Sequence, residues 1–355
     1  DLFWSNFWVT PGRSLGLFAF GGLLALAVIS QPTVLATAAV EAQSLVIRGV
    51  EQCAPVTPFV FDGDVRDLPH PREWQPGDPT KEIPMRFYTP PGVALLPIDK
   101  LGIDPLLQVQ ELITGELLLD VDQFTTPTRN FTGQGFTGVN PPDTVGDVGP
   151  DHYIQMINSG TGARVQIWDK AEPAPNSLAN FYMDSFGSGA CANGYGDPVV
   201  LYDRQAERWM LTEFASSGNH LCVYISQTAD PVSGGWYFYD FTTPTFPDYP
   251  KYAVWATDAN GGSGSYVVTA NDGGPGVYAL DRGAMLLGEA ATFQKLSMGG
   301  LSGFGIQGPA PADPDGPDPP PAGSPAIIMR HADTEVHITD PADGDLLEMW
   351  LFDVD

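Results

Sequence analysis

The chain has 355 residues, of which 16 are basic and 43 are acidic, giving a formal net charge of −27 at pH 7. A field of that sign repels a phosphate backbone and an anionic membrane surface, so the composition excludes nucleic acid as a partner. The 40 Gly and 34 Pro residues exceed one fifth of the chain, which favours many turns and few long helices.

The first segment, residues 1–38, is predicted to be an export signal. Its uncharged apolar run from Leu15 to Ile29 is preceded by Arg13, and it is too short for a membrane-spanning helix. The small residues Ala36 and Ala38 provide the pattern that a signal peptidase cleaves. We therefore expect an extracellular or cell-surface protein without a stable membrane span after cleavage. The alternative is an uncleaved membrane anchor.

The second segment, residues 39–129, is rich in proline, which disfavours helix interiors and central strands. One short amphipathic stretch, Leu106 to Leu119, is compatible with either a helix or a strand. We interpret the segment as a pro-region or as an extended arm that lies along the domain that follows it.

The third segment, residues 130–355, contains a repeated feature: an aromatic or aliphatic residue followed by Asp at the end of a strand-like run. The five Asp residues are separated by 34, 37, 41 and 72 residues, and they are Asp169, Asp203, Asp240, Asp281 and Asp353. We expect these Asp residues to accept backbone N–H bonds in tight turns.

A second repeat lies within these units, because the run Tyr153–Asn158 matches Tyr266–Asn271 in both pattern and distance to the next Asp of the series. Between these runs, four further segments have strand composition. They are Asp197–Asp203, Arg208–Ala215, His220–Thr228 and Gly235–Thr242. A period of 37–40 residues with several short strands predicts an all-β fold of antiparallel β-propeller-like blades. The chain ends inside a strand-like run, so we expect either that the propeller is truncated here or that the segment from Leu106 to Leu119 supplies a closing strand. A pair of β-sandwiches is the alternative.

Several stretches of this segment resemble a family of uncharacterised secreted bacterial proteins. The similarity covers roughly residues 101–355. Its most specific motifs are FTGQGFTGVNPPDTVGDVGPDHY at 131–153, GDPVVLYD at 196–203 and FPDYPKY at 246–252. The resemblance implies a secreted propeller that is cut short here, and it implies no particular activity or catalytic residue.

Cys191 and Cys222 bracket a strand-rich stretch, and in an exported protein they are the natural disulfide pair. Such a bond would leave Cys53 as a single thiol. The alternative is that Cys191 and Cys222 are buried free thiols.

The residues His331, Asp333, Glu335 and His337 alternate along a strand-like run, so a strand would place all four on one face. Imidazole and carboxylate groups arranged in this way can bind Zn²⁺ or Mn²⁺. The alternative is an ordinary strand whose solvent-facing side is charged.

A calcium site is a further expectation, because Asp143, Asp147 and Asp151 recur every four residues among glycines and prolines. The second acidic turn, Asp313 to Asp318, lies in the Pro-rich stretch from Pro309 to Pro325, which is more simply explained as an inserted, solvated loop.

No nucleophile elbow, P-loop or dinucleotide-binding fingerprint is present in the sequence. Carboxylate candidates for glycoside hydrolysis are Asp197, Glu213 and Asp248. The aromatic residues Tyr195, Trp236, Tyr249 and Trp255 are candidates for stacking on sugar rings, and core packing explains them equally well. We therefore expect a secreted binding module that recognises polysaccharide or a cell-surface component. A polysaccharide-acting hydrolase or lyase and a structural module of a larger surface protein remain alternatives.

Overall fold

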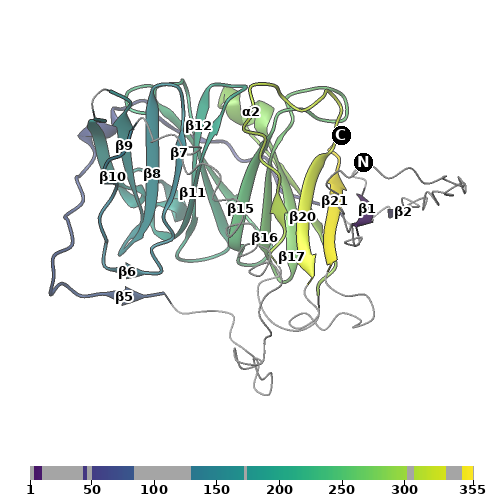
Figure 1. The fold of residues 1–355 in the computed structure, drawn as a ribbon, viewed down its shortest axis with the longest axis horizontal. Helices are drawn as coiled ribbons and strands as arrows, with labels where there is room; N and C mark the ends of the chain where they lie inside the picture. The colour runs from purple at the N-terminus through teal and green to yellow at the C-terminus, as the bar shows by residue number, and fades with distance from the viewer. Residues whose placement is uncertain are drawn as a thin grey trace, which may run out of the picture. The chain divides into compact units, whose positions relative to one another are not determined.

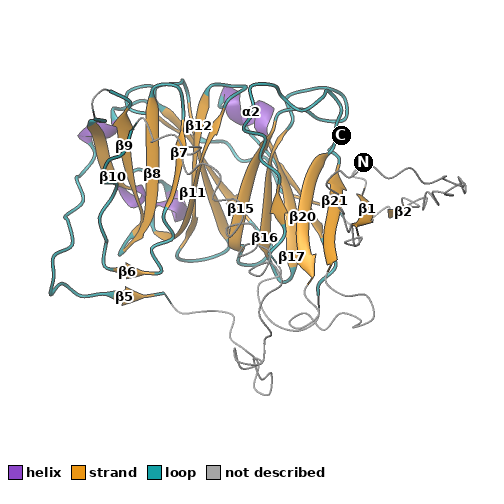
Figure 2. Cartoon of the chain, viewed as in Figure 1, coloured by secondary structure: helices purple, strands orange, loops and turns teal. Residues whose placement is uncertain are grey.

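The computed structural model describes residues 4–9, 43–45, 50–83, 129–171, 174–301, 308–332 and 346–354. The predicted signal segment beyond Val9 and the stretch from Leu106 to Leu119 lie outside the described residues. Nearly all regular structure is β-strand, as Figure 2 shows. None of the helices that the structure describes has the length and apolar character needed to cross a membrane. The all-β prediction is confirmed.

The chain divides into two compact units, which we describe separately. One unit comprises Pro58–Thr242 and contains two antiparallel sheets (Figure 1). The strands of its first sheet are β7 (Val145–Val148), β8 (His152–Ser159), β9 (Gly162–Asp169) and β10 (Ser177–Tyr182). The strands of its second sheet are β11 (Gly194–Asp203), β12 (Arg208–Ala215), β13 (His220–Ser226), β14 (Trp236–Thr242) and β4 (Phe59–Phe61). The four strand-like segments predicted between Asp197 and Thr242 are therefore confirmed.

The other unit contains the described residues of 4–57, 243–301 and 308–354. The strands of its first sheet are β15 (Asp248–Trp255), β16 (Ser265–Asn271), β17 (Pro275–Asp281), β18 (Phe293–Ser297) and β3 (Glu51–Gln52). The strands of its second sheet are β19 (Ala310–Pro311), β20 (Ala326–Ala332), β21 (Leu346–Phe352), β1 (Trp4–Val9) and β2 (Gln43–Leu45). Among the described residues of this unit, the α-helix α2 (Arg282–Leu287) follows β17.

Each large sheet has a central run of three or four consecutive antiparallel strands, and three of the sheets add one or two strands from the N-terminal part of the chain at an edge. The sheets begin at Val145, Gly194, Asp248 and Ala310, so successive starts are 49, 54 and 62 residues apart. The predicted period of 37–40 residues is therefore not the spacing of the sheets. The connections between sheets, including the 3-10 helices η3 (Met183–Ser185) and η4 (Gly189–Ala192), lengthen the repeat.

The five aromatic–Asp corners occupy different places in the sheets. Asp169, Asp281 and Asp353 end or follow the third strand of a sheet. Asp203 ends a first strand and Asp240 lies in a fourth strand. The predicted turn role is nevertheless present at three corners. Asp169 accepts N–H bonds from Ala171 and Asn176, Asp203 accepts from Ala206, and Asp281 accepts from Ala284.

The second repeat is equivalent in register as well as in sequence. Tyr153 in β8 pairs with Trp168, which precedes Asp169, and Tyr266 in β16 pairs with Leu280, which precedes Asp281. Both runs are therefore the second strand of a sheet, paired in the same way with the third strand.

Apolar side chains of the two sheets in the 58–242 unit form one core. Its aromatic centre is Phe186, whose ring lies 4.4 Å from that of Phe238 and 5.4 Å from that of Tyr224. Cys191 and Cys222 are members of this core and form the predicted disulfide. Cys53 is a free thiol in the other unit, and burial raises its pKa.

The Pro-rich segment contributes short strands to sheets in both units. β3 pairs with β18, and β4 pairs with β14, so each covers an outer sheet edge. Further along, Glu73 accepts hydrogen bonds from the guanidinium of Arg164, a buried residue of β9, and Arg164 Nε donates to Asn180 Oδ1 at 2.9 Å. This ion pair holds the segment against the first sheet.

We predict that Glu73→Ala lowers the free energy of unfolding by about 1–2 kcal/mol, because it leaves the buried Arg164 charge with a single protein partner. Urea unfolding followed by circular dichroism measures this change. Arg72→Ala is the matched control, since Arg72 forms an exposed ion pair with Asp78. Equal losses in both variants would contradict the proposed role of Arg164.

Candidate functional site

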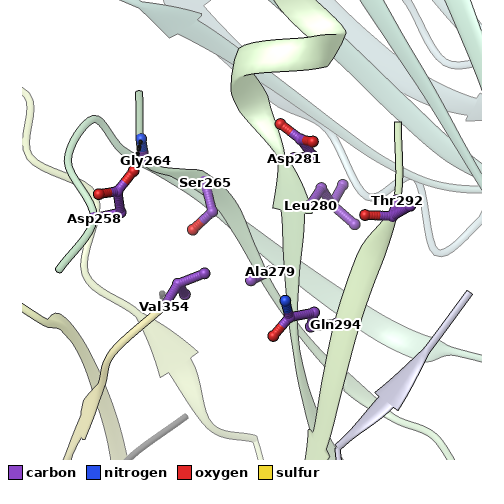
Figure 3. Close-up of a pocket in the computed structure, with 9 residues that line it drawn as sticks. All are labelled: Asp258, Gly264, Ser265, Ala279, Leu280, Asp281, Thr292, Gln294 and Val354. Atoms are coloured by element: carbon purple, nitrogen blue, oxygen red, sulfur yellow. Dashed lines mark hydrogen bonds between the residues drawn. The ribbon is translucent and has the colours of Figure 1, made fainter. Parts of the chain in front are cut away.

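A pocket of about 190 Å³ opens at one end of the β15–β18 sheet. Figure 3 shows its lining side chains, which come from the ends of three strands and from nearby loops. The lining residues are Asp258, Gly264, Ser265, Ala279, Leu280, Asp281, Thr292, Gln294 and Val354. All of them belong to the unit that contains α2.

The antiparallel register brings these residues together. Ser265, the first residue of β16, pairs with Asp281, the last residue of β17. Ala279 in β17 pairs with Gln294 near the start of β18. The start of β16, the end of β17 and the start of β18 therefore lie side by side at the same end of the sheet.

Three neutral polar side chains in the pocket have no hydrogen-bond partner among the residues that the structure describes. They are the hydroxyls of Ser265 and Thr292 and the amide of Gln294. Ser265 is only 3% exposed. Buried polar groups are normally paired, either with protein or with water or ligand. These three groups therefore have hydrogen-bonding capacity available for a bound molecule.

Two carboxylates flank these groups, and each is held by backbone N–H donors. Asp258 Oδ1 accepts from Asn260 N at 2.9 Å and from Gly262 N at 2.8 Å. Asp281 Oδ1 caps the N-terminus of α2 by accepting from Ala284 N at 3.0 Å. Leu280, Ala279 and Val354 add apolar surface, and no lining residue is basic. This combination suits a neutral molecule with several hydroxyl groups better than an anion.

The carboxylates proposed from the sequence for catalysis lie elsewhere. Asp197 is in β11 with a φ of +48°, and its backbone N–H donates to Asn158 Oδ1. Asp248 begins β15, and its Oδ1 accepts from Tyr249 N. Neither residue lines the pocket in Figure 3.

Glu213, the third candidate, is 1% exposed in β12 and lies close to a second carboxyl group. Its Oε2 accepts from Ala163 N at 2.9 Å, whereas Asp184 Oδ1 accepts from Gly194 N at 2.6 Å. Both oxygens lie within 3.0 Å of the position that a Cβ would occupy at Gly162, so they are less than about 6 Å apart. Gly162 has a φ of +82°, a backbone conformation that glycine adopts readily and that would be strained in a residue with a Cβ.

Burial raises the pKa of both carboxyl groups in this pair. Desolvation is the largest cause for Glu213, and the nearby negative charge of Asp184 raises the pKa of Glu213 further. Desolvation is likewise the largest cause for Asp184. The sequence approach found Glu213 only as a member of a well-patterned strand, and it missed Asp184.

The predicted zinc or manganese ligands are only partly described. His331 lies on β20 and is exposed, while its neighbour Ala332 is buried, as the predicted alternation requires. Asp333, Glu335 and His337 lie outside the described residues. Within the described ranges, no three His, Cys, Asp or Glu side chains are grouped so that they could hold a metal ion.

The proposed calcium ligands make separate contacts. Asp143 Oδ2 accepts from Asn158 Nδ2 at 2.7 Å, and Asp147 Oδ2 accepts from Tyr202 N at 2.6 Å. Asp151 is exposed before β8. Asp143 and Asp147 therefore each accept a hydrogen bond from a different residue of the protein.

Two of the aromatic residues proposed for sugar stacking are buried. Trp236 Nε1 donates to Pro231 O, and Trp255 Nε1 donates to Ser324 O. The stacking prediction is wrong for these two residues, because their rings pack inside the protein. Tyr249 is 40% exposed.

Comparisons of the chain with protein-family models, with curated proteins and with solved structures found no match. The candidate site therefore rests on its own geometry.

The raised pKa of Glu213 predicts a specific pH dependence of stability. The contribution of Glu213 to stability is complete at pH values below its ordinary pKa of 4.5. It is lost as the pH rises through the higher pKa of the folded state, because the buried carboxyl must then ionise. Glu213→Gln, which stays neutral, should therefore reduce the loss of stability between acidic and mildly alkaline pH.

Urea unfolding at several pH values measures this difference, with the exposed Glu51→Gln on β3 as the control. If Glu213→Gln and the wild-type protein lose the same stability as the pH rises, the buried carboxyl is not the cause.

Proposed function

We propose that this chain is an exported binding protein of β-propeller-like architecture and that it binds saccharide hydroxyl groups in the pocket of Figure 3. The ligand class is a polysaccharide or a glycan-bearing cell-surface component. The proposal concerns binding without turnover.

The propeller part of the proposal is supported by the sheet topology. The large sheets are antiparallel meanders of sequential strands, as in propeller blades. The equivalent pairing of Tyr153 with Trp168 and of Tyr266 with Leu280 supports a repeated blade. Export is supported by the apolar segment at 15–29, and the Cys191–Cys222 disulfide is consistent with it. The resemblance to secreted bacterial proteins points the same way.

The binding part is carried by one observation: Ser265, Thr292 and Gln294 converge on a pocket without hydrogen-bond partners in the described protein. A hydroxyl group both donates and accepts, so it can pair with a serine or threonine hydroxyl, with an amide and with a carboxylate. The apolar residues beside them can pack against the C–H face of a sugar ring. At about 190 Å³ the pocket is below the usual range for drug-sized ligands, which fits one sugar unit of a longer chain.

Binding to a glycan array, followed by calorimetry with the best ligand, tests this proposal. We expect Ser265→Ala and Thr292→Val each to weaken binding about 3- to 10-fold, the effect of losing one hydrogen bond of about 0.5–1.5 kcal/mol. The double variant should weaken it further. Ser217→Ala, at an exposed serine outside the pocket, is the control and should bind as the wild type does.

Absence of binding to every glycan and to cell-wall preparations would contradict the proposal. Binding that is unaffected by Ser265→Ala and Thr292→Val would place the ligand outside this pocket.

A second candidate function is polysaccharide hydrolysis, which the Glu213–Asp184 pair favours. Two carboxyl groups less than about 6 Å apart, with raised pKa values, resemble the arrangement that retaining glycosidases use. However, Glu213 is 1% exposed, which leaves little room for a substrate. For this reason we favour binding.

A turnover screen on polysaccharides separates the two functions. The binding proposal predicts no hydrolysis above background for the wild-type protein. Product release that disappears in both Glu213→Gln and Asp184→Asn, while folding is preserved, would instead identify a hydrolase.

A further inference from the structure

The lining of the pocket in Figure 3 carries charge of one sign only. Two acidic residues, Asp258 and Asp281, contribute to it, and none of its lining residues is basic. Within the described ranges, neither carboxylate forms an ion pair. The negative charge at the pocket is therefore not compensated by a described cationic side chain.

Each of the two carboxylates keeps one oxygen available for a ligand. Asp281 is exposed, and its Oδ1 accepts from Ala284 N, whereas its Oδ2 accepts no hydrogen bond from the residues that the structure describes. Asp258 is half-buried, and its Oδ1 accepts two backbone N–H bonds. Its Oδ2 has only a long contact of 3.5 Å with Gly264 N.

A buried hydroxyl group lies next to this charge. Ser265 is opposite Asp281 in the pairing of β16 with β17, which sets their Cβ atoms about 4.5–5.5 Å apart. Ser265 is 3% exposed and lines the pocket, and its hydroxyl has no partner among the described residues. Because buried hydroxyls are normally paired, Ser265 indicates a bound molecule independently of the carboxylates.

The two kinds of group together restrict the chemistry of the ligand. An ammonium group offers three donors and a positive charge, so it pairs with a carboxylate more strongly than a neutral hydroxyl does. The net charge of −27 also raises the local concentration of cations at the surface. A simple amine, however, has no hydroxyl groups for Ser265, Thr292 and Gln294. A sugar with one free amino group meets both requirements.

We propose that the pocket prefers saccharides that carry a free, protonated amino group over their neutral counterparts. The ammonium group pairs with Asp281 and is further stabilised by the charge of Asp258, while ring hydroxyls pair with Ser265, Thr292 and Gln294. This inference rests on the proposed function, because it names the class of saccharide that the same pocket binds. The rival occupant is the ammonium group of a lysine side chain in a basic peptide.

Calorimetry with matched sugars tests this preference at mildly acidic pH, where the sugar amine is protonated. D-glucosamine, D-galactosamine and D-mannosamine differ from D-glucose, D-galactose and D-mannose only by an amino group in place of one hydroxyl. We expect at least one amino sugar to bind about 3- to 10-fold more tightly than its counterpart, the combined effect of two partly exposed carboxylates. The preference should decrease as the salt concentration rises.

Asp281→Asn and Asp258→Asn identify the groups responsible. Each variant keeps an oxygen that accepts the backbone N–H bonds, since Asn caps a helix as well as Asp does, and removes only the charge. Each should lower the preference about 2- to 3-fold, and the double variant should abolish it. Because the preference is a ratio of two affinities, an effect common to both sugars cancels. Asp315→Asn, which removes an exposed carboxylate outside the pocket, is the control and should keep the preference.

The outcomes separate this inference from the proposed function. Neutral sugars that bind and are weakened by Ser265→Ala, with no amino sugar binding more tightly, would overturn the inference and leave the proposed function intact. No binding by either set of sugars would contradict both. A preference that persists in the double variant would also overturn the inference. So would n-butylamine that binds as tightly as the best amino sugar, because it would identify a site for lysine side chains.

Discussion

The antiparallel pairing between the second and third strands of each sheet is the constraint on which the candidate site depends. In the β15–β18 sheet this pairing sets Ser265 opposite Asp281, and the pairing of the third strand with the fourth sets Ala279 opposite Gln294. A shift of one residue would turn each side chain to the other face of the sheet, so the pocket exists only in this register. The side chains of β16 and β17 are buried on both faces of these strands, so neighbouring residues pack against them from either side of the sheet. Polar groups at the strand ends can therefore remain unpaired at a cost that the core offsets.

The outer edges of the sheets impose a second constraint, since an exposed strand edge invites pairing with other chains. Residues of the Pro-rich segment meet this constraint in both units. β3 covers β18 and β4 covers β14, although each strand is only two or three residues long. The Glu73–Arg164 ion pair fixes the same segment further along the chain. Strands of two or three residues are sufficient to cover the edges of β18 and β14, because few hydrogen bonds are needed to prevent another chain from pairing there.

The sequence predicted individual strands better than their grouping into sheets. The strands from β11 to β14 were found because they are short, rich in β-branched and aromatic residues and bounded by turn residues. The repeat length was misjudged because an aromatic residue followed by Asp ends several kinds of strand. Asp203 and Asp240 carry this signal within a single sheet, at its first and fourth strands. The run Tyr153–Asn158 and its match at Tyr266–Asn271 were the better guide, because their pairing partners are equivalent.

The candidate site was not predicted from the sequence. Ser265, Thr292 and Gln294 belong to no motif, and their types are common on any strand surface. What distinguishes them is that they line one pocket without hydrogen-bond partners among the described residues, which depends on register and packing. Asp281 was singled out from the sequence only as a turn residue. It does have that role, because its side chain caps the N-terminus of α2, but its place in the pocket was not predicted. Glu213 was selected for its strand, and the closeness of Asp184 depends on the fold of the 3-10 segment after β10.

A crystal structure of the protein soaked in a concentrated monosaccharide solution tests the central claim most directly. The account predicts a sugar ring in the pocket, with hydroxyls in hydrogen-bond contact with Ser265 Oγ, Thr292 Oγ1 and the Gln294 amide. Water alone in that pocket, with sugar bound at some other surface, would contradict it.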